Sequence, residues 1–424
     1  MSYKHKYFNV LVFMMMLTTF LPVVANNLPK FIGSFHFYAV LFISSGLVME
    51  PKVILNKNIL ASLLICLFLL VLFPLTIWKD MDDWNKKSLQ FEFYYIIMSL
   101  IIYQYYKINK DKYFLAKIIK YIVIFVGITA IMTIIASNID PMYARTLSGI
   151  GYKTEQESQY FKRLGGGTYP TANVIMSLIP MIIYFYKNNH LVTYSRITII
   201  FYSILLFIAL IRMQIFANIL IGIIFTILSM QGRRNIRKSI IYIILLTFIL
   251  LLIPKTKYAE MLIYLSSFFN NLSEVHFKLT DMAKYLITGE ETTAIGGRAM
   301  RYPELLTTFI QSPILGDFYE HQKIYSGAGG HLYWMNKLAT LGVIGFIIFL
   351  QLYYLNIKSQ LRDISNIEFK LFYLLSIGSI IVYGLIKNIA GRETFFMLFF
   401  ILPNLQYYHY NWHRNTAVQN NLQK

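Results

Sequence analysis

Long apolar segments separated by short charged or polar stretches dominate the pattern along this chain. The segments are about 17 to 22 residues long, which is the length a helix needs to cross the hydrocarbon core of a membrane. They lack the ten-residue alternation that is typical of membrane β-barrel strands, and they are too apolar for a disordered chain. The pattern predicts an all-α, polytopic helical membrane protein that forms one domain over residues 1–424.

About twelve spans are expected from the apolar segments and the residues that interrupt them. They are predicted at residues 7–25, 31–49, 59–77, 90–106, 114–136, 170–186, 197–211, 213–230, 239–253, 332–355, 369–386 and 393–408. The first segment could instead be a signal peptide cleaved after Val23-Val24-Ala25, which would leave eleven spans.

The charges between the spans predict the orientation. With the N-terminus in the cytoplasm, the basic stretches at 107–117 and 232–238 fall in cytoplasmic loops, and most carboxylates fall on the opposite side. The short external loops are poor in Lys and Arg, so the positive-inside rule favours both termini in the cytoplasm. In a bacterium this predicts a multi-pass protein of the inner (plasma) membrane.

Composition agrees with a membrane protein and narrows the function classes. Hydrophobic residues make up 57% of the chain and charged residues 14%, whereas soluble domains carry about 25% charged residues. The net charge of +19 reflects topology, so we expect membrane lipids and no nucleic acid as partners. Cys66 is the single cysteine, which excludes an intramolecular disulfide.

Two external loops are too long to be simple connections: residues 137–169 and residues 254–331. Loops of this length are usually functional or disordered. The second alternates apolar and polar stretches with few Pro or Gly before Gly296, which predicts short helices on the outer membrane surface. If the protein carries out chemistry, we expect it on the external side.

Arg212 is the most unusual charged residue of the apolar segments, because it interrupts an apolar stretch from residue 197 to 230. That stretch is too long for one span, and two short spans would put Arg212 at the turn between them. Arg212 then either extends toward lipid headgroups or is kept for a function. A planar, permanently charged guanidinium suits a phosphate or pyrophosphate.

The first long loop ends in Arg163-Leu-Gly-Gly-Gly-Thr-Tyr169-Pro-Thr-Ala-Asn173. Three consecutive glycines allow the backbone to approach a ligand and to turn N–H groups toward it. The helix that begins near the proline would add its positive end to an anion site. A plain turn before a helix is the alternative, and Arg163 next to the glycines favours the anion site.

The second long loop contains a further group of candidate residues. Arg298 and Arg301 share one face if residues 298–301 are helical, and an anion between them would offset their repulsion. Glu304 and Asp317 follow, the latter directly after Ser-Pro-Ile-Leu-Gly. His331 lies at the start of the tenth span, where a lone histidine is most often structural unless cationic neighbours give it a role.

Together these residues resemble the bacterial O-antigen polymerase and O-antigen ligase superfamily (Wzy-type and WaaL-type proteins). The resemblance covers the hydropathy plan, the segment from Arg163 to Asn173, the segment from Arg298 to Gly316, and His331 with Gly342-Val-Ile-Gly345 eleven residues later. Leu332 departs from the pattern, because the family often has a polar residue there.

The resemblance implies a glycosyltransferase of the C-type fold that needs no metal and no cofactor. Its substrates would be lipid-linked oligosaccharide repeat units on undecaprenyl pyrophosphate, with a flippase and a chain-length regulator as partner proteins. Carried over, the family roles make Arg212 and Arg298 or Arg301 the pyrophosphate ligands and His331 the general base. Further substrate contacts would come from Arg163, Tyr169, Asn173, Glu304 and Asp317.

Four functions stay open at this point. The departure at Leu332 favours a polymerase that extends a surface polysaccharide, and a ligase that transfers the finished glycan to lipid A core comes second. A transporter of lipid-linked oligosaccharides would use the same arginines without chemistry, and would need charged residues deep in several spans. A purely structural role would account for neither long loop, so this function ranks last.

Overall fold

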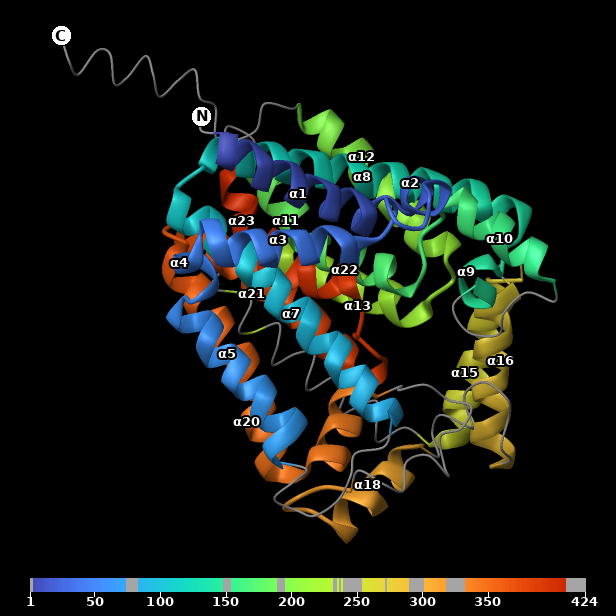
Figure 1. The fold of residues 1–424 in the computed structure, drawn as a ribbon. Coiled ribbons are helices and arrows are strands. Elements are labelled where there is room, and N and C mark those ends of the chain that lie inside the picture. The colour runs from blue at the N-terminus through green and yellow to red at the C-terminus, as the bar shows by residue number, and fades with distance from the viewer. Residues whose placement is uncertain are drawn as a thin grey trace.

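The computed structural model describes residues 3–73, 83–147, 154–188, 195–231, 235, 238, 254–270, 273–289, 301–317 and 332–408. Throughout these ranges the regular elements are helices, and the ranges contain no strand (Figure 1). The prediction of an all-α chain is therefore confirmed for the part of the protein that the structure describes.

Helices occupy predicted apolar segments and also parts of both predicted long loops. In chain order they are α1 (Tyr3–Phe20), α2 (Pro22–Asn27), α3 (Phe35–Met49), α4 (Pro51–Ile54), α5 (Lys57–Leu67) with η1 (Phe68–Leu72), α7 (Asp83–Asn109), α8 (Lys112–Ile139), α9 (Tyr143–Arg145), α10 (Glu155–Leu164), α11 (Tyr169–Lys187), α12 (Arg196–Arg212), α13 (Phe216–Met230), α15 (Lys255–Ser267), α16 (Ser273–Thr288), α18 (Arg301–Gln311), α20 (Tyr333–Asp363), α21 (Ile367–Ile386), α22 (Arg392–Phe396), η4 (Met397–Ile401), α23 (Leu402–Asn404) and η5 (Leu405–Tyr407). The predicted span at 239–253 lies outside the described residues.

Four helical stretches within the described ranges are long and apolar enough to cross a membrane. They are Lys112–Ile139, Glu155–Lys187 (α10 with α11), Tyr333–Asp363 and Ile367–Ile386. Shorter apolar helices are Phe35–Met49, Lys57–Leu72 and Phe216–Met230. Length and composition together support a helical membrane protein.

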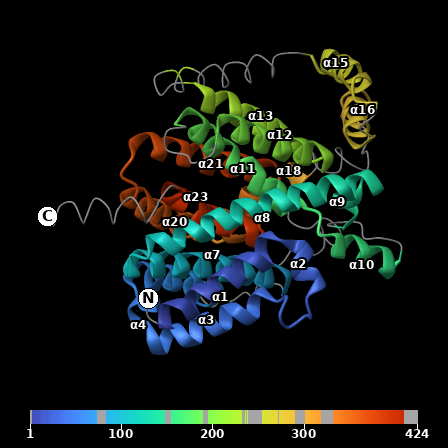
Figure 2. The ribbon, with the colours of Figure 1, turned by 90° about the horizontal axis from the view of Figure 1, so that it is seen from above.

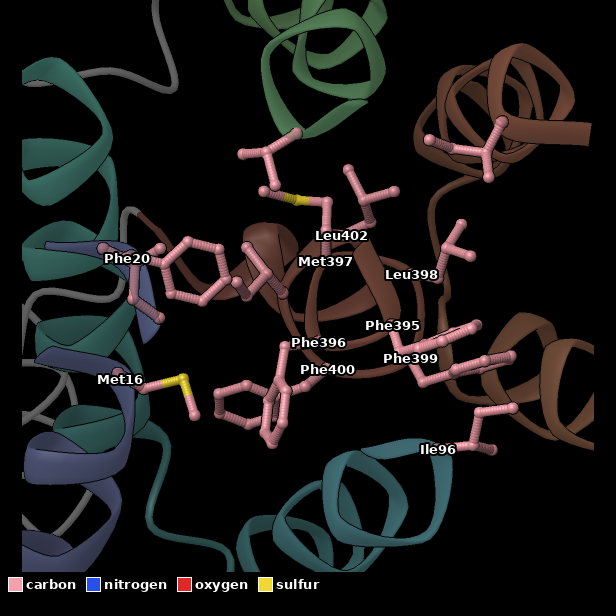
Figure 3. Close-up of a cluster of buried hydrophobic side chains, with 14 of the residues drawn as sticks. Met16, Phe20, Ile96, Phe395, Phe396, Met397, Leu398, Phe399, Phe400 and Leu402 are labelled. Atoms are coloured by element: carbon pink, nitrogen blue, oxygen red, sulfur yellow. The ribbon is translucent and has the colours of Figure 1, made fainter. Parts of the chain in front are cut away.

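A buried helical segment, formed by α22, η4, α23 and η5, occupies the centre of the bundle. Every residue from Phe395 to Leu402 is at most 3% exposed. Figure 3 shows this segment end-on, with Met16 and Phe20 of α1 and Ile96 of α7 directed toward it. Because its apolar residues occupy the whole circumference, this segment has to be enclosed by other helices.

The described helices of the first predicted external loop, and α15 and α16 of the second, lie at one end of the bundle (Figure 1). Figures 1 and 2 show α2, α9, α10, α15 and α16 at this end, and the N-terminus with α4 at the opposite end. We call the former the outer end. α22 begins on the outer side of the central segment and is set back from α9 and α10 (Figure 1).

α20 is two helices joined at Gly342, whose backbone is left-handed (φ 61°, ψ −176°). The hydroxyls of Tyr333 and Tyr353 lie 2.7 Å apart, although twenty residues of straight helix would separate them by about 30 Å. The segment 333–341 therefore folds back on the segment 343–363. The predicted span at 332–355 contains this reversal.

The chain after α18 fits into the break in α20. Pro313 and Ile314 accept hydrogen bonds at their carbonyls from the N–H groups of Val343 and Ile344, at 2.8 and 3.2 Å. The N–H of Asp317 donates to the carbonyl of Ala339 at 3.0 Å. The backbone groups that the break frees are thus satisfied by the other chain segment.

Candidate functional site at the outer end of the bundle

Arg163 is exposed in the last turn of α10 at the outer end. Acidic residues in the first turn of α10 and basic residues in the last turn complement the helix dipole. Asn27, the last residue of α2, holds this turn in place, because its Nδ2 donates to the carbonyl of Arg163 at 2.8 Å. The guanidinium is left facing solvent, where a ligand can reach it.

The three glycines after Arg163 pack closely against neighbouring helices. Gly165 has φ +68°, and a β-carbon on it would come within 2.2 Å of the backbone of Val23. The N–H of Gly167 donates to Oγ1 of Thr133 at 2.7 Å, and its carbonyl accepts a hydrogen bond from the hydroxyl of Tyr143 at 2.5 Å. Close packing thus explains the glycines, and the Gly167 N–H is already used within the protein.

Burial raises the pKa of Tyr143 above its ordinary value. Its hydroxyl donates to the carbonyl of Gly167. The short helix α9 that carries Tyr143 begins just after Pro141. This segment therefore anchors the glycine turn that follows Arg163.

Arg212 lies at the turn that the sequence predicts, as the last residue of α12, and it is exposed. The following Gln214 has φ +53°, and its Nε2 donates to the carbonyl of Pro141 at 3.1 Å. The turn with Arg212 and the turn with Arg163 are thus both tied to the segment that contains Pro141 and Tyr143. Both turns therefore lie at the outer end of the bundle.

Asn173 is buried, at 2% exposure, and joins three elements of the bundle. Its Oδ1 accepts a hydrogen bond from Nδ2 of Asn218 on α13 at 2.9 Å, and its Nδ2 donates to Oγ1 of Thr394 on α22 at 3.4 Å. Tyr169 begins the same helix and is half-buried. Asn173 acts here as a link between α11 and the start of the central segment.

The candidates of the second long loop are only partly described. Arg301 begins α18, in which Glu304 lies in the first turn and is half-buried. Asp317 is 8% exposed and lies at the break in α20. Arg298 and His331 lie outside the described residues.

Arg392 and Glu393, which the sequence analysis did not select, lie at the outer start of the central segment. Nη2 of Arg392 donates to the carbonyl of Thr18 at 3.0 Å, and the guanidinium lies 5.2 Å above the ring of Phe35. Oε1 of Glu393 is 3.8 Å from the guanidinium. An Arg-Glu pair directly before an aromatic run was the signal that could have indicated this position.

Glu92 on α7 and Lys337 on α20 form a buried ion pair of 2.8 Å. Their side chains are 0% and 10% exposed, and the hydroxyl of Tyr353 donates to Oε1 of Glu92 at 3.2 Å. Both residues fall inside predicted spans, and the rule that ionisable groups within spans are retained for a reason would have selected them.

The chemistry available at the outer end is that of cations, amides, carboxylates and aromatic rings. Within the described ranges no group of three or more His, Cys, Asp or Glu residues could hold a metal ion. No protein-family model matches this chain, and neither a curated protein nor a solved structure is detectably similar to it.

Proposed function

We propose that this protein is a metal-independent glycosyltransferase that polymerises lipid-linked repeat units of a surface polysaccharide such as O-antigen. The observation that carries the proposal is the common location of exposed Arg163 and Arg212 at the outer end of an apolar bundle. A donor with a lipid tail and a pyrophosphate head needs this combination of apolar helices and cations at their ends. Arginine binds phosphate oxygens through paired, charge-assisted hydrogen bonds.

The proposal includes the finer membrane plan. The protein would cross the inner membrane about twelve times in a C-type glycosyltransferase arrangement, with both termini in the cytoplasm and the outer end in the periplasm. Undecaprenyl-pyrophosphate-linked repeat units would reach the site from the membrane, with a flippase and a chain-length regulator acting on the same pathway. α1 begins, and α23 lies, at the end of the bundle opposite to α9 and α10 (Figure 1), which supports placing both ends of the described chain on one side.

The proposed reaction transfers a glycan between two lipid-linked units. An acceptor hydroxyl attacks the anomeric carbon of the donor sugar, the bond from that carbon to the pyrophosphate oxygen breaks, and His331 takes the hydroxyl proton. Negative charge grows on the leaving pyrophosphate, so Arg212 with Arg298 or Arg301 would stabilise the transition state more than the ground state. Arg163 would hold a further phosphate or sugar oxygen.

Complementation of a deletion strain tests this function. Wild type, Arg212→Ala, His331→Ala and a control, Arg196→Ala at the opposite end of α12, are compared on a lipopolysaccharide gel at matched expression. We expect single repeat units on the lipid A core in the deletion and in the first two variants, and a full ladder with the control. Lipid A core without any unit, with lipid-linked polymer accumulating, would instead indicate a ligase. Full ladders from both site variants would contradict the catalytic assignment.

Two observations favour transport of lipid-linked oligosaccharides as a second candidate. α20 is interrupted at Gly342, and the Glu92–Lys337 pair is buried between α7 and the folded-back half of α20. Broken helices with buried charges are typical of transporters. Purified protein that forms polymer from lipid-linked units in detergent, where no membrane separates two compartments, would exclude transport as its only activity.

A further inference from the structure

Arg392 is the one guanidinium of the described residues that lies at the outer start of the central segment, and it combines burial with incomplete hydrogen bonding. Its side chain is 24% exposed, while its Nε is buried and has no hydrogen-bond partner among the described residues. A buried, unpaired donor on a charged group is costly to a protein, so it needs an explanation. An oxyanion bound at the exposed part of the guanidinium would offset this cost.

The charge of Arg392 is only weakly balanced by its neighbours. Oε1 of Glu393 lies at 3.8 Å, beyond hydrogen-bond distance, and the Thr18 carbonyl is neutral. The site therefore keeps a positive charge that an anion can neutralise.

Aromatic rings surround this charge. Phe35 lies beneath the guanidinium, and the ring of His36 stacks on that of Tyr94 at 5.3 Å and 23°. Phe35 packs against the rings of Tyr94 and Tyr95, with centroids 6.0 and 5.9 Å apart, and these two rings lie 5.3 Å from each other. Such rings offer an apolar wall for an isoprenoid or for the apolar face of a sugar.

The aromatic group is open on its lipid-facing side. His36 is exposed, and Phe91, which stacks with Tyr95, is 54% exposed. Exposed apolar residues such as Val40 continue along the same helix, α3. A membrane-embedded lipid can therefore approach the rings laterally, with its headgroup at the level of Arg392.

We propose that Arg392, with the aromatic rings of Phe35, His36, Tyr94 and Tyr95, binds the pyrophosphate of a polyprenyl-linked substrate at the outer start of the central segment. This inference rests on the proposed function and adds a substrate site that neither long loop contains. Arg392 would contact the pyrophosphate directly, in a way that a lysine reproduces only in part, because the planar guanidinium can present two parallel N–H groups to an oxyanion.

Binding of farnesyl pyrophosphate to the purified full-length protein in detergent tests the site. We compare wild type, Arg392→Gln, Arg392→Lys and the control Arg196→Gln, whose guanidinium lies over Tyr186 at the opposite end. We expect Arg392→Gln to weaken binding about tenfold or more, Arg392→Lys less, and the control to bind as wild type does. Inorganic pyrophosphate should compete, and binding of farnesol should not respond to the substitutions.

The outcomes separate this inference from the proposed function. If wild type binds and Arg392→Gln binds equally, the Arg392 site is wrong and the proposed function stands. If wild type does not bind farnesyl pyrophosphate, the proposed function fails and the inference fails with it. If Arg392 only links α22 to α1, its substitution would lower the Tm without changing the Kd for farnesyl pyrophosphate. Should Arg392→Gln not fold, unchanged binding by Arg392→Lys at a wild-type Tm would overturn the site.

Discussion

The backbones of Gly316 and Gly342 lie against each other, and both residues have left-handed dihedrals, with φ +79° and +61°. A β-carbon on Gly342 would come within 2.4 Å of the nitrogen of Gly316, and the reverse contact is equally short. This contact holds the chain after α18 inside the break of α20. It gives a physical reason for glycine in both of the motifs that follow Arg298 and His331 in the sequence.

We predict that Gly342→Ala and Gly316→Ala each destabilise the protein by more than the cost of a left-handed residue alone, which is about 1–2 kcal/mol. The excess comes from the backbone contact, which cannot relax as a flexible side chain can. The measurement is thermal unfolding of the full-length protein in detergent.

Gly289→Ala is the matched control for this prediction. Gly289 has φ +70°, but nothing lies within 4 Å of the position of its β-carbon. Its substitution should therefore cost only the left-handed backbone energy. Equal losses of Tm at positions 289 and 342 would show that the close contact carries no stability.

The Glu92–Lys337 pair leads to a second prediction. Removing one partner leaves a buried charge unpaired, so Glu92→Gln or Lys337→Met should each destabilise the protein by about 3–5 kcal/mol. The double variant should be more stable than the sum of the two losses predicts, because neither charge is then left alone. A double-mutant cycle from thermal or denaturant unfolding measures this coupling.

The exposed pair Lys257–Glu260 on α15 provides the comparison for the buried one. Its nitrogen and oxygen also lie 2.8 Å apart, but the side chains are 67% and 64% exposed. Exposed pairs contribute about 0–1 kcal/mol, so Lys257→Met should leave the Tm nearly unchanged. Additive losses of stability in the double-mutant cycle would argue against an ion pair between Glu92 and Lys337.

Hydropathy predicted a helical chain because the length and apolar character of each segment are local properties of the sequence. It also placed Arg212 at a turn, since an apolar stretch of that length has to be interrupted. The reversal at Gly342 could not be read in the same way, because it lies inside a continuous apolar segment. Its cause is the distant residue Gly316.

The site was less predictable than the fold because it depends on contacts between residues that are far apart in the sequence. Local sequence indicated arginines, glycines and a histidine, but not which of them meet. The glycines after Arg163 are used in packing against Val23 and Tyr143, which lie in other segments. Glu92 finds its partner on a helix near the other end of the chain, so pairing depends on the tertiary fold.

A third prediction concerns Asn173, which connects α11 with α13 and α22. Asn173→Ala removes both hydrogen-bond partners and leaves the buried side chains of Asn218 and Thr394 without them, at a cost of about 1–3 kcal/mol. Asn188→Ala is the control, because Asn188 only bonds the carbonyl of Tyr184 one turn earlier in its own helix. If Asn173→Ala retains the wild-type Tm, the buried amide network does not hold the three helices together.

A fourth prediction tests which end of the bundle faces the periplasm. Cys66 is only 6% exposed, so the chain with Cys66→Ala gives a background for single cysteines placed at either end. Lys162 at the outer end and Lys57 at the start of α5 are both exposed and occupy opposite ends. In spheroplasts, Lys162→Cys should react with a membrane-impermeant maleimide, and Lys57→Cys should react only after lysis. The reverse pattern would put Arg163 and Arg212 in the cytoplasm, on the wrong side for a periplasmic polymerase, whereas the expected pattern places the arginines where flipped lipid-linked sugars arrive.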